Sequence, residues 1–307
     1  MADRICLTGI SGANPLGFLA ALGAFRVLSN CSDRELTMGW EMSAGRWRPY
    51  ITGLSGSQSE ICDSLHSHLQ DSAWTKLFRA IGDNLTISPM RFSDIAVEFF
   101  SETIDNLSVS AESLDMLAAL GTDTVHQPHS KDRSLMQDTA LRTMSGAGHQ
   151  HFIKFILSII ATTGESHYQS TLFETWRYTD EGRGLNLRWD PIDDRRYATR
   201  WKNPSSDASV TMRGANRLAI EALPLMTVAL VGQRAETTGF HSNNWIWPIW
   251  DGELGLPVVS TVLQMASLEG RDAKARQELA SRGVVERFMS RRITVGKFRN
   301  FTPARAM

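Results

Sequence analysis

The stretch Trp189–Met226 holds arginines with flanking aromatic residues, two side-chain types suited to binding a nucleic acid. Guanidinium groups form forked hydrogen bonds to phosphates, and aromatic rings stack on bases. The acidic pair Asp193-Asp194 stands directly before the first arginines, so an ion-paired surface around ordinary turns is the alternative interpretation. The candidate nucleic-acid contacts in this stretch are Arg195, Arg196, Arg200, Arg213, Asn216 and Arg217.

A second basic segment lies near the end of the sequence. From Arg282 to Met307 there are seven bases and one acid, and phenylalanines are interleaved with them. The β-branched run Ile293–Val295 predicts strand structure rather than a solvated tail. We therefore predict an ordered arm that contacts phosphates, and we expect it to form one basic groove with the arginines of the first stretch. The candidates here are Arg291, Arg292, Lys297 and Arg299.

Two histidines, His149 and His151, follow the glycine-rich loop Ser145–Gly148 and precede an apolar helix, Phe152–Ile160. Histidine can act as a general base, a metal ligand or a phosphate donor. For a metal site, further ligands such as His126 and His129 are candidates only by residue type. A glycine loop before a helix favours contact with a phosphate or a neighbouring subunit, so we include His149 among the nucleic-acid contacts.

Catalytic motifs are missing from the sequence. It contains no GxSxG elbow, no HExxH zinc motif and no phosphate-binding Walker loop. The carboxylate pair Asp193-Asp194 stands beside Arg195-Arg196 and is self-neutralising. We therefore predict no catalytic residue, no cofactor and no metal. The alternative is a stand-alone nuclease or phosphotransferase that uses His149 and His151.

A helix start at Asn14-Pro15 is a further candidate site. Asparagine is a favoured N-cap and proline a favoured first helical residue, and the following residues to Leu28 are apolar on nearly every face. The free N–H groups of a helix N-terminus can bind a phosphate, so Asn14 joins the candidate nucleic-acid contacts. A simple tight turn is the alternative.

Composition limits the class of protein. The chain has 307 residues, 42% hydrophobic and 21% charged residues, and a net charge of −1, so nucleic-acid binding requires local basic patches. Three cysteines without CxxC spacing fit a reducing cytosol. The first ten residues lack the apolar core of a signal peptide, and no apolar run is long enough to span a membrane. We expect a cytoplasmic protein without membrane contact.

The pattern of elements predicts an α+β fold with an antiparallel-leaning sheet, a helical insertion near residues 57–120 and a basic, β-rich C-terminal arm. The insertion is acidic, with eight acids and one base from Asp83 to Asp123. The polar segment Thr122–Arg133 predicts a mobile loop or subdomain boundary, which divides the chain into residues 1–125 and 126–307. Trp245–Trp250 alternates aromatic and aliphatic residues, which predicts a strand whose tryptophans pack the core.

Three segments resemble a known family. Asn14–Leu28, NPLGFLAALGAFRVL, resembles the opening of subunits of subtype I-U (also called I-G) CRISPR effector complexes. Gly214–Met226, GANRLAIEALPLM, resembles a late helix of these proteins, and Trp245–Val259, WIWPIWDGELGLPVV, resembles the segment after it. The order of the three also agrees. The family resembled is that of the large subunit of the complex. Because this chain is short for a large subunit, the resemblance leaves two alternatives, a reduced large subunit or an accessory, backbone-like subunit.

The resemblance implies a non-catalytic subunit of an RNA-guided antiviral defence complex in a bacterial cytoplasm. Its partners would be guide RNA, target DNA and other subunits of the effector. In such complexes base pairing supplies sequence specificity, while the protein contributes backbone contacts, recognition of a short flanking motif and assembly surfaces. A near-neutral chain with a basic arm and an acidic helical region suits this task.

Overall fold

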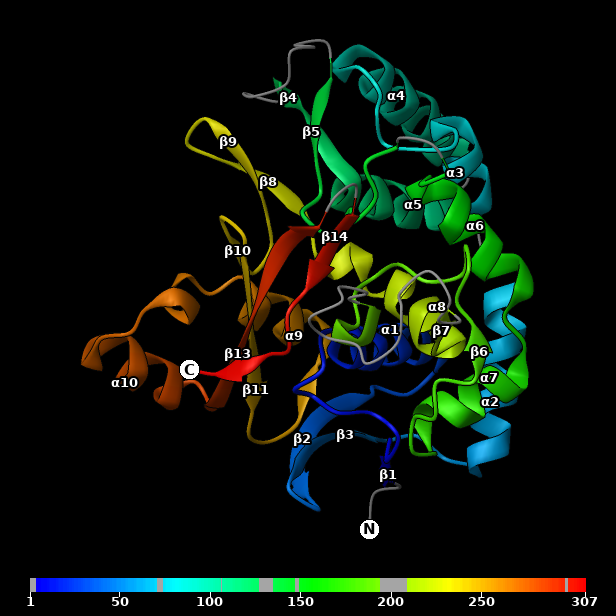
Figure 1. The fold of residues 1–307 in the computed structure, drawn as a ribbon. Helices are drawn as coiled ribbons and strands as arrows, with labels where there is room; N and C mark the ends of the chain where they lie inside the picture. Colours follow the sequence, from blue (N-terminus) through cyan, green and yellow to red (C-terminus); the bar gives the residue numbers. More distant parts are fainter. Residues whose placement is uncertain are drawn as a thin grey trace.

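The computed structural model describes residues 4–70, 74–105, 107–126, 135–146, 149–193, 209–295 and 298–307. It has the predicted α+β fold, in which helices pack beside antiparallel sheets (Figure 1). Within these ranges no helix combines the length and apolar composition needed to cross a membrane. The α-helices are α1 (Pro15–Cys31), α2 (Gln58–Gln70), α3 (Trp74–Ile81), α4 (Pro89–Asp105), α5 (Leu107–Leu120), α6 (Phe152–Thr162), α7 (Glu165–Leu172), α8 (Arg213–Glu221), α9 (Leu256–Leu263) and α10 (Ala273–Ser281).

Helix α1 occupies the centre of the molecule (Figure 1). As predicted, Asn14 caps it: its Oδ1 accepts a hydrogen bond from the Gly17 N–H at 3.0 Å, and every residue from Pro15 to Leu28 is buried. Its closest neighbour is α8, and a methyl group at Gly23 would lie only 1.8 Å from the Leu218 carbonyl oxygen. Glycine at this position therefore lets the two helix backbones approach closely.

One sheet lies below α1 in Figure 1, with strand order β1-β3-β2-β12. The β2–β3 hairpin forms its centre, and its turn at Ala44-Gly45 places both residues at positive φ (49° and 71°), as tight hairpin turns require. The strands of this sheet are β1 (Arg4–Cys6), β2 (Thr37–Ser43), β3 (Arg46–Thr52) and β12 (Leu254–Gly255).

The second sheet contains the C-terminal arm, with order β10-β11-β13-β14 and with β15 pairing β13. All its pairings are antiparallel, and β13 is the longest strand at 12 residues. The strands are β10 (Phe240–His241), β11 (Asn244–Trp250), β13 (Val284–Val295), β14 (Phe298–Phe301) and β15 (Arg305–Ala306).

Tryptophans of β11 connect the two sheets. Trp245, Trp247 and Trp250 are completely buried, which confirms the prediction that they pack the core. The Trp247 Nε1–H donates to the Gly12 carbonyl at 2.8 Å, and the Trp250 Nε1–H donates to the Met38 carbonyl at 3.0 Å. These bonds fix the β11 face over both the start of α1 and the first sheet.

The remaining short elements join these layers. The boundary predicted at residues 125 and 126 falls within β4, which pairs with β5, and the buried apolar residues of both parts form one core cluster. The segment predicted as a polar loop, Thr122–Arg133, therefore begins as a strand. The alternating β-branched residues Thr122 and Thr124 favour this conformation. Residues 127–134 of the segment lie outside the described ranges. These elements are β4 (Gly121–His126), β5 (Met136–Asp138), β6 (Asp180–Glu181), β7 (Val210–Thr211), β8 (Val228–Val231), β9 (Arg234–Thr237) and the 3-10 turns η1 (Pro191–Asp193), η3 (Leu223–Leu225) and η4 (Ala266–Glu269).

Candidate nucleic-acid interface

The basic arm is ordered strand structure, as its β-branched residues predicted, and its arginines lie in different environments. Arg287 is buried, and its Nη1 donates to the carbonyls of Leu268 (2.6 Å) and Gly270 (2.7 Å) in the turn around η4. Arg287 therefore connects η4 to β13 through hydrogen bonds, and its role is structural.

Arg291 lies in a groove that is formed by β11, β13, β15 and the turn between β10 and β11. The groove has a volume of about 460 Å³, within the range of small-ligand sites. We call it the Arg291 groove; its lining residues are Ser242, Asn243, Asn244, Met289, Arg291, Thr302, Pro303 and Arg305.

Strand register brings the lining of the Arg291 groove together. Asn244 of β11 stands opposite Arg291 of β13, and Arg305 of β15 stands opposite Met289. Because side chains on a strand alternate between faces, Met289 and Arg291 point to the same side of β13. The tight turn at Ser242, which has a φ of 55°, adds Asn243 at the rim.

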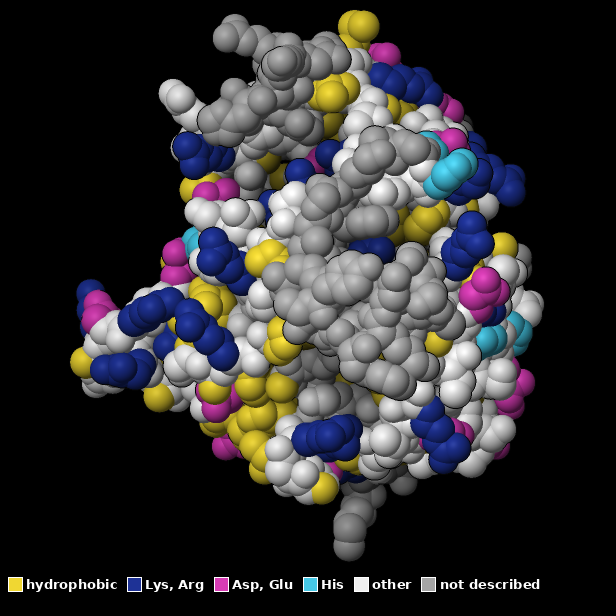
Figure 2. All heavy atoms as spheres, in the orientation of Figure 1, with side chains coloured by type: hydrophobic (Ala, Val, Ile, Leu, Met, Phe, Trp, Pro, Cys, Tyr) yellow, Lys and Arg dark blue, Asp and Glu magenta, His cyan; other side chains and the backbone are white. Residues whose placement is uncertain are grey.

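The Arg291 groove is cationic, and the described residues that line it include no acidic side chain. Arg291 and Arg305 are exposed, and neither forms an ion pair with any acid among the described residues. The neighbouring His241 side chain contacts the carboxylate of Glu269, with 2.6 Å between Nε2 and Oε1. Figure 2 shows further Lys and Arg side chains gathered over α10 and beside β13. The arrangement can bind a phosphate chain through charge and neutral hydrogen-bonding groups.

Arg292 and Arg299 lie on the other face of the arm. Arg292 donates to the Ala140 carbonyl at 2.7 Å and to Asn243 Oδ1 at 3.3 Å, while Arg299 donates to the Arg142 carbonyl at 3.4 Å. Burial lowers the pKa of Arg292 to about 10, with repulsion from Arg299 as the next cause, and burial also lowers the pKa of Arg299. Arg292 and Arg299 therefore lie near the groove, but the side chain of each is only partly exposed to solvent.

The structure places Asn216 and Arg217 in the core, contrary to the prediction that they face a nucleic acid. Asn216 is fully buried; its Oδ1 accepts from the Leu187 N–H at 2.9 Å, and its amide donates to Thr211 and to the Met212 carbonyl. These bonds secure the start of α8. The polar groups of Asn216 are therefore used within the protein.

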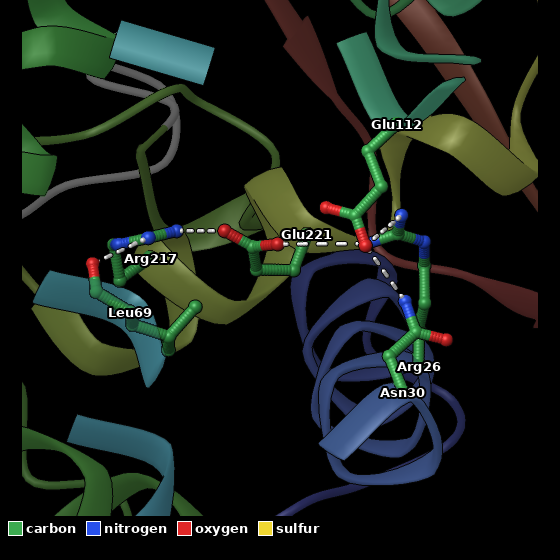
Figure 3. A network of polar contacts seen from close by, with 6 residues as sticks. All are labelled: Arg26, Asn30, Leu69, Glu112, Arg217 and Glu221. Carbon is green, nitrogen blue, oxygen red and sulfur yellow. Dashed lines mark hydrogen bonds and ion pairs between the residues drawn. The ribbon is translucent and has the colours of Figure 1, made fainter. Parts of the chain in front are cut away.

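Arg217 belongs to a buried polar network between helices (Figure 3). Only 1% of it is exposed, its Nη1 donates to Glu221 Oε1 and its Nη2 donates to the Leu69 carbonyl at 3.1 Å. Glu221 also faces Arg26 of α1 at 3.7 Å, and Arg26 lies 4.0 Å from Glu112 of α5. The network thus connects α8 to α1, α2 and α5; Arg217 and Glu221 lie at its buried end, and Glu112 lies at its partly exposed end.

Asn14 is likewise engaged inside the chain. Besides capping α1, its amide donates to Asp190 Oδ1 at 3.2 Å, and Tyr178 donates to Asp190 Oδ2 at 3.0 Å. Burial raises the pKa of Asp190, and the hydrogen bonds from Ile192, Tyr178 and Asn14 oppose that rise. The Oδ1 and the amide of Asn14 are thus both hydrogen-bonded within the protein, to the Gly17 N–H and to Asp190, so the expected phosphate contact at Asn14 is not supported.

The other candidates are dispersed. Arg213 donates through its backbone N–H to Asp180 at 2.8 Å and through Nη1 to the Thr162 carbonyl at 3.4 Å, so it lies by α6 and β6 and not on the arm. The expected single groove uniting both arginine stretches therefore does not include Arg213 or Arg217. Four candidates lie outside the described residues, namely Arg195, Arg196, Arg200 and Lys297.

His149 is exposed and His151 is the N-cap residue of α6, without a side-chain cap bond. Gly146, in the loop before them, has a φ of 84° and packs so closely on Asn84 that a side chain there would collide with its amide. Among the described residues, no group of three or more His, Cys, Asp or Glu side chains is placed to hold a metal ion.

Sequence reasoning missed three parts of this interface: Asn243, Asn244 and Arg305. The two asparagines follow Ser242 at the tip of a hairpin, and this polar turn between apolar strands was a signal for a tight turn but not for a site. Arg305 becomes part of the groove only because β15 pairs with β13, a contact that the sequence does not reveal.

No family model matches the sequence, and no curated protein matches it.

Proposed function

We propose that this protein is a nucleic-acid-binding subunit of a CRISPR RNA-guided DNA surveillance complex and contacts the phosphate backbone through the Arg291 groove. The observation that carries the proposal is the groove's lining, in which two exposed arginines stand among neutral polar groups without an acid. An unpaired surface guanidinium is available to a phosphate, whereas one held by a carboxylate first has to exchange partners.

The chemistry of the lining favours backbone contact over base recognition. None of the described lining residues carries an aromatic ring on which a base could stack. Phosphate contacts position a protein on its nucleic acid but carry little sequence information. This fits a complex in which a guide RNA pairs with the target DNA and the protein supports the strands.

Two further features support a subunit role. The segments Asn14–Leu28, Gly214–Met226 and Trp245–Val259 resemble subunits of subtype I-U effectors, and the structure uses all three in its central core. The acidic helices α4 and α5 lie at the upper end of the molecule in Figure 1, and the strands β13 and β15 lie toward the lower left. We assign the acidic end to protein neighbours and the basic face to guide RNA or target DNA.

Two experiments test the proposal. The first is purification of the tagged protein from its source cells, which should recover a short RNA together with other effector subunits. The second compares R291A, R305A and the double variant with wild type in binding a labelled oligonucleotide at several salt concentrations. R46A is the matched control, because Arg46 is an exposed arginine at the β2–β3 turn.

Each groove variant should bind more weakly, and the slope of log affinity against log salt should fall by roughly 0.7–0.9 for each lost contact. The loss should be similar for oligonucleotides of different sequence. Unchanged slopes in folded R291A and R305A would contradict the groove assignment. Stoichiometric zinc or manganese that is lost in H149A would favour a metal-dependent nuclease or phosphotransferase instead.

A further inference from the structure

Three arginines converge on one carboxylate behind the Arg291 groove. Arg142 follows β5, Arg292 belongs to β13 and Arg299 belongs to β14; we call these three the arginine cluster. The Arg142 guanidinium pairs with Asp138, with 2.6 Å between Nη2 and Oδ2, and both side chains are more than nine-tenths buried. Figure 2 shows a hollow between β5 and the β13–β14 hairpin, with Lys or Arg side chains along its floor.

The arginine cluster carries more positive charge than its surroundings neutralise. Asp138 is the one acid among the described groups that act on Arg292 and Arg299, so three guanidiniums face one carboxylate. The direct partners of Arg292 and Arg299 are the carbonyls of Ala140 and Arg142 and the amide of Asn243, which are neutral. A positive charge that is shielded from water is normally matched by a carboxylate, so three guanidiniums that share one carboxylate leave a local excess of positive charge.

Hydrogen-bond donors in the arginine cluster are also unused. Arg142 is only 5% exposed, yet its Nε and Nη1 have no hydrogen-bond partner among the residues that the structure describes. A guanidinium has five N–H donors, and its flat fork matches two oxygens of one tetrahedral anion. Within the described part of the chain, the Arg299 side chain makes one long hydrogen bond, so it also has unused donors. Excess charge and unsatisfied donors therefore occur at the same place.

We propose that Arg142, Arg292 and Arg299 form a binding site for a phosphate group. The ligand is either a free phosphate or a phosphodiester of a nucleic acid; only the second source rests on the proposed function. Arg292 links the site to the groove, because its Nη2 bonds to Asn243 on the groove rim. A strand that lies in the groove can thus place a neighbouring phosphate at the cluster.

The test uses the full-length protein with two probes: inorganic phosphate, compared with chloride at equal ionic strength, and a fluorescein-labelled oligothymidylate. Phosphate binding is measured by the increase of the thermal unfolding midpoint, and oligonucleotide binding by fluorescence anisotropy. The variant is R299Q, because Arg299 makes the weakest bond of the three and its replacement disturbs the fold least. R46Q is the control with the same change of charge on a distant exposed arginine.

Wild type and R46Q should be stabilised by phosphate beyond the effect of chloride, and R299Q should lose at least about half of that shift. R299Q should also bind the oligonucleotide roughly threefold more weakly if the ligand is a backbone phosphate. R299K keeps the charge but not the fork, so an intermediate phosphate shift is expected, and it replaces R299Q if that variant fails to fold.

A phosphate shift lost in R299Q together with oligonucleotide affinity supports a backbone phosphate as ligand. A phosphate shift lost alone supports a site for free phosphate. A phosphate shift in R299Q and R299K equal to that of wild type overturns the proposal. The groove variants R291A and R305A are read separately: if they bind the oligonucleotide normally while R299Q loses its phosphate shift, the proposed function fails and the phosphate site stands.

Discussion

Replacing Arg217 by methionine should destabilise the fold by about 3–5 kcal/mol at neutral pH, the usual cost of breaking a buried ion pair from one side. Arg217 is 1% exposed and Glu221 is 4% exposed, so the orphaned carboxylate cannot gain water. Arg26 remains 3.7 Å away but is shared with Glu112, and the Leu69 carbonyl loses its donor. The loss is a large part of the 5–15 kcal/mol by which typical proteins are stable.

The loss should depend on pH with a defined sign. Burial raises the pKa of Glu221 above its ordinary value of 4.5, and Arg217 is the main group that opposes the rise. Without Arg217 the pKa rises further. A carboxyl with a raised folded-state pKa favours folding below its unfolded pKa, and this contribution is lost as pH rises through the folded-state pKa. R217M should therefore be closest to wild type in mild acid and weakest at neutral pH.

Urea unfolding followed by tryptophan fluorescence, at acidic and at neutral pH, measures both effects. R291M is the matched control, since Arg291 is exposed, and it should unfold like wild type. The double variant R217M/E221L should recover part of the loss, because apolar pairs of similar volume often replace buried ion pairs without penalty. If R217M instead keeps the wild-type unfolding midpoint and loses oligonucleotide binding, Arg217 contacts the nucleic acid and does not hold the core.

Three shorter predictions concern the core and the cysteines. G23A should lower the free energy of unfolding by about 1–3 kcal/mol in a urea titration, because overpacking against α8 outweighs the gain in helix propensity; equal or greater stability would contradict the close approach. W247A should cost about 3–5 kcal/mol, since it empties a fully buried site and removes a hydrogen bond, and oligonucleotide binding should fall only as far as folding does. In native protein a thiol reagent should label exposed Cys31 first, whereas Cys62, whose pKa burial raises to about 12, should react only after unfolding; early labelling of Cys62, seen by mass spectrometry, would show that its site opens.

The sequence predicted those parts of the fold that depend on local pattern. Asn14-Pro15 and the apolar run behind it define the start of α1. Alternation from Trp245 to Trp250 defines β11. The pairing of β12 with β2 and of β15 with β13 joins segments with no local signal, so these contacts could not be predicted.

The candidate site was harder to predict because residue type does not report burial. Arg217 and Asn216 lie in a segment with helical pattern, and the spacing of Arg217 and Glu221, four residues apart, was a signal for an ion pair on one helix. Arg287 is held by carbonyl groups, which the sequence cannot indicate. Only the β-branched context of the arm predicted correctly that its arginines stand on an ordered strand.

Arg291 and Arg292 are consecutive on β13, so their side chains point to opposite faces of the strand. Since side chains alternate, Arg291 faces the groove and Arg292 faces the arginine cluster, although the two are neighbours in sequence. A nucleic acid that contacts Arg291 and Arg305 in the groove reaches the cluster only over the rim at Asn243. Losing a phosphate contact on one face should therefore weaken binding independently of a loss on the other face. The losses of binding free energy in R291A and R299Q should add in the double variant to within about 0.5 kcal/mol. A double variant that is no weaker than R291A alone would show that a strand in the groove does not extend to the cluster.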